Sequence, residues 1–260
     1  MGQYNEKREY KPVQSIERIF QVLEVLALNP EGLSLLALSE KTGLPSSTLH
    51  RLLHTLYALG YTEWRYSSSA PYKLTLRLFE YGSGLVEHRP FIQMARPLLD
   101  RLSEELELSA FIFVPQEPQM ICIACSTHSS LINGPHRGSC VPMWCTASGK
   151  CFLSLQSEEE VLKLWDSRGP SLYGPNALVS SDALIEDLTF VRQNGYCLCT
   201  EEFRVGLSSL SVPLFGYEGD VIGALCLCGP PFRFLPDDVQ YLSDKLKKYG
   251  KSLMSDPNLY

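Results

Sequence analysis

The amino-acid sequence has no apolar run near the roughly 18 residues that a membrane-spanning helix needs. Its opening residues, MGQYNEKREYK, lack the apolar stretch of a secretory signal, and Glu6 breaks the myristoylation pattern that Gly2 would begin. We therefore expect a soluble, cytoplasmic protein with no membrane partner.

The chain also lacks an excess of positive charge, since 29 acidic residues outnumber 23 basic ones and give a net charge of −6. This balance argues against indiscriminate nucleic-acid binding, but it can hide a local basic surface. Up to Thr75 there are eight basic and seven acidic residues. The excess acid therefore lies in the later part, which favours a chain of two parts.

The cysteine pattern does not predict a disulfide framework. The nine cysteines are an odd number, and they are scattered through apolar segments typical of strands. Such usage fits reduced, buried thiols in the cytosol. The 260 residues are 45% hydrophobic and 20% charged, as in a folded protein of one large or two modest domains.

The N-terminal third has the element order of a winged helix-turn-helix. We expect a helix capped by Ser15, a short helix between Ser34 and Gly43, a tight turn, and a third helix opened by Pro45 and Ser46. The third helix has one apolar face and ends at Gly60; that face comprises Leu49, Leu52, Leu53, Leu56 and Leu59. Residues 61–74 are predicted to form the hairpin that makes the wing.

The remaining chain predicts an α+β fold with a mainly antiparallel sheet. Residues 75–88 and 91–106 have helical patterns, and several strand-like runs follow, joined by short turns. The expected strands are residues 110–114, 120–125, 195–200, 207–215 and 221–228, and the expected helices cover residues 146–155, the segment capped by Ser157 and Glu160, 182–194 and 236–253. We predict domains at 1–74 and 90–260, with a linker helix at 75–89.

A recognition helix must present short polar or basic side chains from its first turns, because these reach base edges in the major groove. The third helix and the wing meet this requirement. The candidate DNA-binding residues are Ser46, Ser47, Thr48, His50, Arg51, Arg65 and Lys73. The alternative is a solvated polar helix face, or a ligand- or redox-sensing module whose winged helix docks proteins and binds no DNA.

Several segments resemble the IclR family of bacterial transcriptional regulators. They are residues 12–18, 44–53, 59–61, 72–74, 96–99, 142–143, 147–150, 195–196, 201–202, 206, 223–224 and 229–230. The resemblance implies a dimer formed through the N-terminal region, which often pairs into a tetramer, and a GAF-like effector domain. It also implies binding to a pseudo-palindromic DNA operator under small-molecule control, with repression more usual than activation.

The helix start at Thr146-Ala147-Ser148-Gly149 offers small side chains and free N–H groups that favour an anion such as a carboxylate, or that simply pack. The IclR resemblance implies an effector pocket here. Its expected lining is Thr146, Ala147, Ser148, Cys199, Ser209, Cys226, Leu227 and Cys228. Many members have an acidic residue at the position of Cys199 and small hydroxyls at those of Cys226 and Cys228. The thiols suit a less polar or aromatic effector than a simple hydroxy- or keto-acid.

The cysteine spacing permits a sharper hypothesis. Cys197 with Cys199, and Cys226 with Cys228, should share a face of their strands, whereas the thiols of Cys122 and Cys125 should lie on opposite faces. Buried, inert thiols are the favoured interpretation. A metal site or a redox switch, which Cys199→Ser would abolish, stays open as the alternative.

Motifs of catalysis are missing. Only His128 and His136 lie in the second domain, and neither a Gly-x-Ser-x-Gly elbow nor a phosphate-binding loop is present. Glu201 and Glu202 are adjacent and would alternate faces in a strand. We expect no enzyme activity, no catalytic residues, no cofactor and no resident metal.

Overall fold

A computed structural model describes residues 12–64, 71–87, 89–129, 134–168 and 173–253. The chain divides into two compact units, Met1–Leu85 and Val86–Tyr260. The division falls within the helix α4, Arg77–Glu87, which the sequence predicts as a linker. Each unit is described separately.

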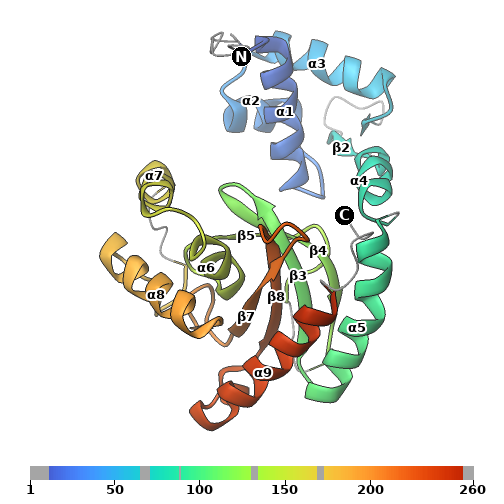
Figure 1. The fold of residues 1–260 in the computed structure, drawn as a ribbon. Coiled ribbons are helices and arrows are strands. Elements are labelled where there is room, and N and C mark those ends of the chain that lie inside the picture. Colours follow the sequence, from blue (N-terminus) through green and yellow to red (C-terminus); the bar gives the residue numbers. More distant parts are fainter. Residues whose placement is uncertain (1–11, 65–70, 88, 130–133, 169–172, 254–260) are drawn as a thin grey trace, which may run out of the picture. The chain divides into compact units, whose positions relative to one another are not determined.

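The first unit has the predicted order of a winged helix-turn-helix (Figure 1). Its elements are α1 (Gln14–Ala27), α2 (Leu35–Thr42), α3 (Ser46–Ala58), β1 (Thr62–Glu63) and β2 (Lys73–Leu74). The two strands pair antiparallel. The tip of the predicted wing, including Arg65, lies outside the described residues.

The helix ends follow the predicted signals with one exception. The Ser34 hydroxyl accepts a hydrogen bond from the Ala37 N–H, and Gly43 ends α2 with a φ of 69°. The predicted cap at Ser15 is wrong, because α1 begins at Gln14 and Val13 occupies the N-cap position. Val13 has no side-chain acceptor, so this end has no capping side chain.

The core of this unit is formed by one face of each helix and by Tyr72. Its buried members are Val22, Leu23, Leu26, Leu38, Leu44, Leu49, Leu53, Leu56 and Tyr72. Leu59, predicted on the apolar face of α3, is 57% exposed because the helix ends at Ala58. Gly32 joins α1 and α2 with a φ of 84°, and a Cβ there would lie 2.7 Å from the Tyr72 carbonyl oxygen. Only glycine fits where Leu33 bridges to Tyr72.

The second unit is built on a six-stranded sheet in which every described pairing is antiparallel, in the order β5-β4-β3-β8-β7-β6. The strands are β3 (Ser109–Gln116), β4 (Gln119–Ser126), β5 (Cys140–Pro142), β6 (Cys197–Thr200), β7 (Ser208–Phe215) and β8 (Val221–Gly229). The helices are α5 (Pro90–Leu106), α6 (Ala147–Leu153), α7 (Glu158–Arg168), α8 (Ser181–Asn194) and α9 (Pro236–Leu253), with a 3-10 turn at Pro231–Arg233. The α+β prediction is confirmed.

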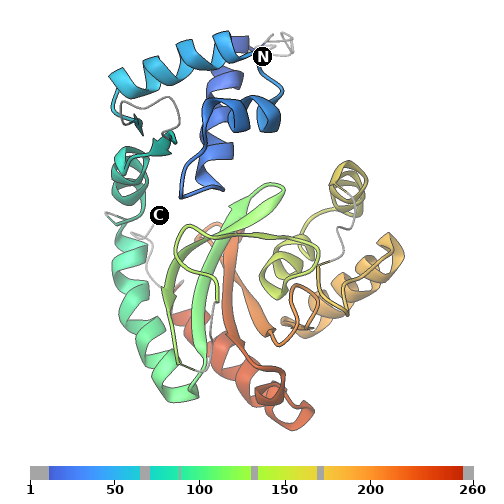
Figure 2. The same ribbon diagram turned by 180° about the vertical axis from the view of Figure 1, so that it is seen from behind.

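Helices cover both faces of this sheet (Figures 1 and 2). On one face α5 and α9 enclose a core that includes Ile112, Leu210 and Leu227. The other face, toward α6, α7 and α8, has a second core that includes Phe111 and Phe113. Adjacent strand residues alternate between the two cores, so the strand register decides which side chains can meet α6.

Two local predictions need correction. The short edge strand β5, which pairs with β4, is not among the expected strands. The thiols of Cys122 and Cys125 were expected on opposite faces, but both side chains pack into the core on the α6 side. A β-bulge in the β3–β4 ladder adds one residue between them and restores the same face.

Candidate DNA-reading helix and effector pocket

The helix α3 separates an apolar face from a polar one. Leu49, Leu53 and Leu56 are buried against α1 and α2. Most of the predicted reading residues lie on the exposed side: Ser46, Ser47, His50 and Arg51 are exposed, and Thr48 is half-buried. The fold therefore presents the first turns of α3 to solvent while its apolar face fixes the helix.

The base of the wing is held by a stacked pair of rings, Trp64 and Tyr72, whose centroids are 5.8 Å apart. Lys73, a predicted phosphate contact, forms an ion pair with Glu31 at 3.4 Å. Glu31 is 96% exposed, so this pair is weak and a phosphate can compete for the ammonium group.

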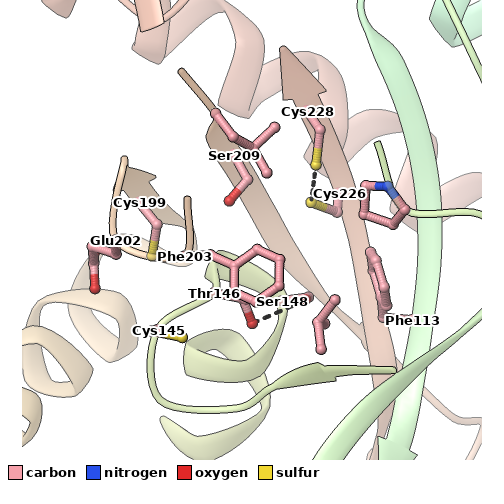
Figure 3. Close-up of a pocket in the computed structure, with 13 residues that line it drawn as sticks. Phe113, Cys145, Thr146, Ser148, Cys199, Glu202, Phe203, Ser209, Cys226 and Cys228 are labelled. Atoms are coloured by element: carbon pink, nitrogen blue, oxygen red, sulfur yellow. Dashed lines mark hydrogen bonds between the residues drawn. The ribbon is translucent and has the colours of Figure 1, made fainter. Parts of the chain in front are cut away.

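In the second unit a pocket of about 370 Å³, including its mouth, opens between the sheet and the start of α6 (Figure 3). Its lining is mostly apolar or thiol-bearing. The lining residues are Phe113, Pro135, Val141, Cys145, Thr146, Ser148, Cys199, Glu202, Phe203, Leu207, Ser209, Cys226 and Cys228.

Six of the eight predicted effector residues line this pocket: Thr146, Ser148, Cys199, Ser209, Cys226 and Cys228. The prediction for Leu227 is wrong for its side chain, which points to the opposite face of β8 and packs in the core beneath α5 and α9. Ala147 is also buried outside the pocket lining, in a cluster with Cys151 and Ala224.

The strand register explains why these thiols meet. Cys226 and Cys228 share one face of β8, and Cys228 is paired with Ser209, which is paired with Cys199. Sulfur atoms of neighbouring cysteines are close, at 3.6 Å for Cys226 and Cys228. Phe113 and Phe203 were missed as lining residues because nothing in their sequence context distinguishes them from ordinary core aromatics.

Three of the pocket thiols, those of Cys145, Cys199 and Cys228, are neutral near pH 7. Burial raises the pKa of Cys145 to about 12 and the pKa of Cys199 well above its ordinary value. The pKa of Cys228 is also raised, by its hydrogen bond to Cys226 and by burial. Thiols of this kind behave as small apolar groups with weak donors, and they are poor nucleophiles. Among the described residues, no group of three or more His, Cys, Asp or Glu side chains is arranged to hold a metal ion.

The Thr146 hydroxyl has a structural task at the pocket wall. It caps α6 by accepting from the Gly149 N–H at 3.3 Å and donates to the Pro142 carbonyl at 2.6 Å. The Ser148 hydroxyl lies 3.5 Å from Thr146. These bonds hold the pocket wall before any ligand enters.

Comparison with protein families decides the identity. The model described as "Bacterial transcriptional regulator IclR C-terminal" matches residues 84–255, and the IclR helix-turn-helix domain matches residues 15–65. The chain belongs to the IclR family. The family resemblance and the helix-turn-helix predicted from the sequence are confirmed.

Relatives of this IclR-family chain include both repressors and activators. It is 30% identical to the transcriptional repressor IclR of Escherichia coli, over 93% of this chain and 89% of that one. It is 28% identical to the p-hydroxybenzoate hydroxylase transcriptional activator of Acinetobacter baylyi, over 86% of this chain and 83% of that one.

Solved structures share the fold. A regulator from Alicyclobacillus acidocaldarius superposes with a TM-score of 0.79 at 21% identity, over 94% of this chain and 98% of that one. An IclR homologue from Microbacterium hydrocarbonoxydans, complexed with 4-hydroxybenzoate, superposes with a TM-score of 0.78 at 20% identity, over 95% of this chain and 100% of that one. The relatives named above are transcriptional regulators. None of the described helices of the IclR-family chain has the length and apolar character to cross a membrane.

Behind the pocket of this IclR-family protein lies a buried ion network. The Lys150 ammonium is fully buried and bonds to Glu202 at 2.6 Å and to Asp187 at 2.5 Å. Burial alone would lower the pKa of Lys150, but surrounding negative charge raises it above its ordinary value. Because burial raises the pKa of Cys199 and the pKa of Cys197 is also raised, both thiols are neutral near pH 7, and the two carboxylates supply that charge. The network ties α6 to α8 and holds the pocket residue Glu202 in place.

Gly149 makes the close approach of α6 to the preceding segment possible. A Cβ at this position would lie 2.2 Å from the Met143 Cα and carbonyl oxygen, which are backbone atoms and cannot move aside locally. We expect Gly149→Ala to lower the free energy of unfolding by at least about 2 kcal/mol, as overpacking of a tight core does.

Chemical denaturation followed by circular dichroism measures this change. Gly82→Ala is the matched control, because no atom lies within 4 Å of a Cβ there. In the helix α4 the control should be neutral or slightly stabilising. Equal stability of Gly149→Ala and the parent protein would contradict the close packing of α6.

Proposed function

We propose that this IclR-family regulator binds a pseudo-palindromic operator through α3 as a homodimer, which can pair into a dimer of dimers, and that a small organic effector in the second unit controls this binding. The observation that carries the proposal is the exposed polar start of α3 on a helix-turn-helix scaffold. Such a regulator acts on chromosomal DNA, so we place it in the cytoplasm.

For base reading we propose the exposed side chains of the first turns of α3. Arg51 is the strongest candidate, because a guanidinium can donate two hydrogen bonds to the O6 and N7 atoms of guanine. Ser46, Ser47 and His50 lie on the same exposed side. Thr48, Arg65 and Lys73 would complete the contacts, the last two with phosphates.

The helix α4 supports a dimer. None of its residues is buried, and its side chains of Leu78, Phe79 and Leu85 are exposed by 40%, 64% and 69%. A contiguous apolar helix face of this kind favours a partner surface. In the proposed assembly the partner is the same helix of a second copy, which would set the spacing of two reading helices near one or more turns of DNA.

For the effector we propose a small aromatic or weakly polar acid that bears a hydroxyl group. Phe113 and Phe203 offer ring contacts, the neutral thiols offer apolar contacts, and Glu202 offers an acceptor for a hydroxyl group. A relative's structure contains 4-hydroxybenzoate, which has this chemistry. The effector would change DNA affinity by binding one arrangement of the dimer more tightly than another.

Salt dependence tests DNA binding directly. Each phosphate contact releases counterions, so the logarithm of the association constant for operator DNA should fall linearly with the logarithm of the salt concentration, with a slope of about −0.9 for each contact. Fluorescence anisotropy with labelled DNA measures this slope. If the protein shows no DNA binding at low salt and captures a protein partner, the winged helix would instead be a protein-docking module.

Ligand binding has its own test. We expect 4-hydroxybenzoate to raise the melting temperature of the parent protein and to have a smaller effect on Ser209→Leu, which fills the pocket. Saturable binding that Ser209→Leu leaves unchanged would place the effector site elsewhere.

A further inference from the structure

Two cysteines of β8 bring their sulfur atoms together in the wall of the pocket (Figure 3). Cys226 and Cys228 are two positions apart on the strand, so they share the face that is turned toward α6. Their Sγ atoms are 3.6 Å apart, and both residues line the pocket. Neither the proposed operator contacts nor the proposed organic effector requires two sulfur atoms to lie so close.

This separation suits two sulfur ligands of one pyramidal atom. Bonds from sulfur to a thiophilic centre are about 2.3 Å long, as in zinc thiolates, and two such bonds that meet at about 100–110° place their sulfur atoms about 3.5–3.8 Å apart. Three-coordinate, trivalent arsenic is pyramidal and has angles near the lower end of this range. A linear two-coordinate ion would instead need sulfur atoms about 4.6 Å apart, and tetrahedral zinc would need two further protein ligands.

A third sulfur ligand from the neighbouring strands is out of reach. Cys199 is separated from Cys228 by β7, where Ser209 is the register partner of both cysteines. Two strand spacings amount to about 9–10 Å, which is too far for a shared ligand atom. The third position on arsenic is therefore left to a hydroxyl or organic group on the pocket side, where Ser209 and Phe113 also lie.

A second pair of thiols in the same sheet provides a comparison. The Sγ atoms of Cys197 and Cys199 are 3.9 Å apart, a separation that requires a wider angle at the shared atom. Cys199 lines the pocket, but Cys197 is buried outside the lining, in a cluster with Cys151 and Val191. Only one thiol of this pair therefore faces the pocket, whereas both thiols of the β8 pair do.

We propose that Cys226 and Cys228 form a binding site for trivalent arsenicals. Arsenous acid, As(OH)3, exchanges two hydroxyl groups for the two thiols: two As–O and two S–H bonds break, two As–S bonds form, and two water molecules leave. Arsenic stays trivalent, so the step needs neither an oxidant nor a reductant. Arsenous acid is small and uncharged at neutral pH, which suits a pocket lined mostly by apolar and thiol-bearing side chains.

Native mass spectrometry of the full chain, reduced with a phosphine and incubated with sodium arsenite, tests the site. The parent protein should first gain one arsenic, with the mass of arsenous acid less two water molecules. Cys226→Ala and Cys228→Ala should each bind at least about 100-fold more weakly, because the second As–S bond of a chelate forms within one molecule. Cys197→Ala and Cys140→Ala are the matched controls and should bind as the parent does. Parent-like binding by both β8 variants, or loss of binding in Cys197→Ala alone, would overturn the proposal.

X-ray absorption at the arsenic edge tests the same site in the parent protein. With one arsenite loaded per chain, we expect two sulfur neighbours at about 2.3 Å and one oxygen neighbour. A shell of three sulfur atoms, or of oxygen atoms only, would refute the proposed coordination. This measurement needs no variant, so a folding defect in a cysteine substitution cannot mask the answer. Both tests are independent of whether the protein binds an operator or 4-hydroxybenzoate.

Discussion

Arg51→Ala is expected to abolish sequence-specific DNA binding while leaving the fold and effector affinity intact. A bidentate contact to a base contributes about 1–3 kcal/mol of discrimination, and the proposed homodimer would lose it in both half-sites, so the expected loss is about 2–6 kcal/mol. The Arg51 side chain is exposed on α3. Its removal should therefore change the free energy of unfolding by no more than about 0.5 kcal/mol.

Two companion variants separate base reading from charge. Arg51→Lys keeps the positive charge but loses the paired N–H donors of the guanidinium group. This variant should therefore lose sequence specificity and retain binding to non-specific DNA. His54→Ala alters an exposed residue later in the same helix, outside the first turns, and should bind the operator as the parent protein does. Unchanged specific binding by Arg51→Ala would show that α3 reads DNA through other residues.

Lys150→Met should cause a large loss of stability in the second unit. The change leaves Glu202 buried with an unpaired charge, and breaking a buried ion pair from one side costs about 3–5 kcal/mol. For a unit of this size that corresponds to roughly 6–20 °C in the melting temperature. Effector binding should weaken with it, because Glu202 lines the pocket.

Lys163→Met is the matched control for this experiment. Lys163 forms an exposed pair with Glu159 on α7, so its loss should cost less than about 0.5 kcal/mol. Adding Glu202→Gln to Lys150→Met should recover part of the stability by removing the unpaired charge. A melting temperature for Lys150→Met equal to that of the control would mean that the network does not stabilise the unit.

The helices and the separation of polar from apolar residues could be predicted from the sequence because they depend on local signals. Ser34 and Gly43 define α2 by a cap and a left-handed turn, and the leucine spacing of α3 identifies its buried face. The six predicted residues that line the pocket came instead from the family resemblance. The prediction failed at the adjacent position Leu227, because successive side chains of a strand point to opposite faces of the sheet.

Features that depend on contacts between distant segments could not be predicted. The partners of Lys150 lie 37 and 52 residues away, and nothing local distinguishes this lysine from a surface one. The bulge at Ile123 depends on how β3 and β4 align, and one inserted residue reverses the expected relation of Cys122 and Cys125.

Sequencing of genomic DNA fragments retained by the purified protein, at low and high salt, tests the central claim most directly. The account predicts that fragments share a pseudo-palindromic motif, that high salt releases them, and that Arg51→Ala fails to enrich the motif. Retention of no shared motif by the parent protein, with or without 4-hydroxybenzoate, would contradict operator binding through α3.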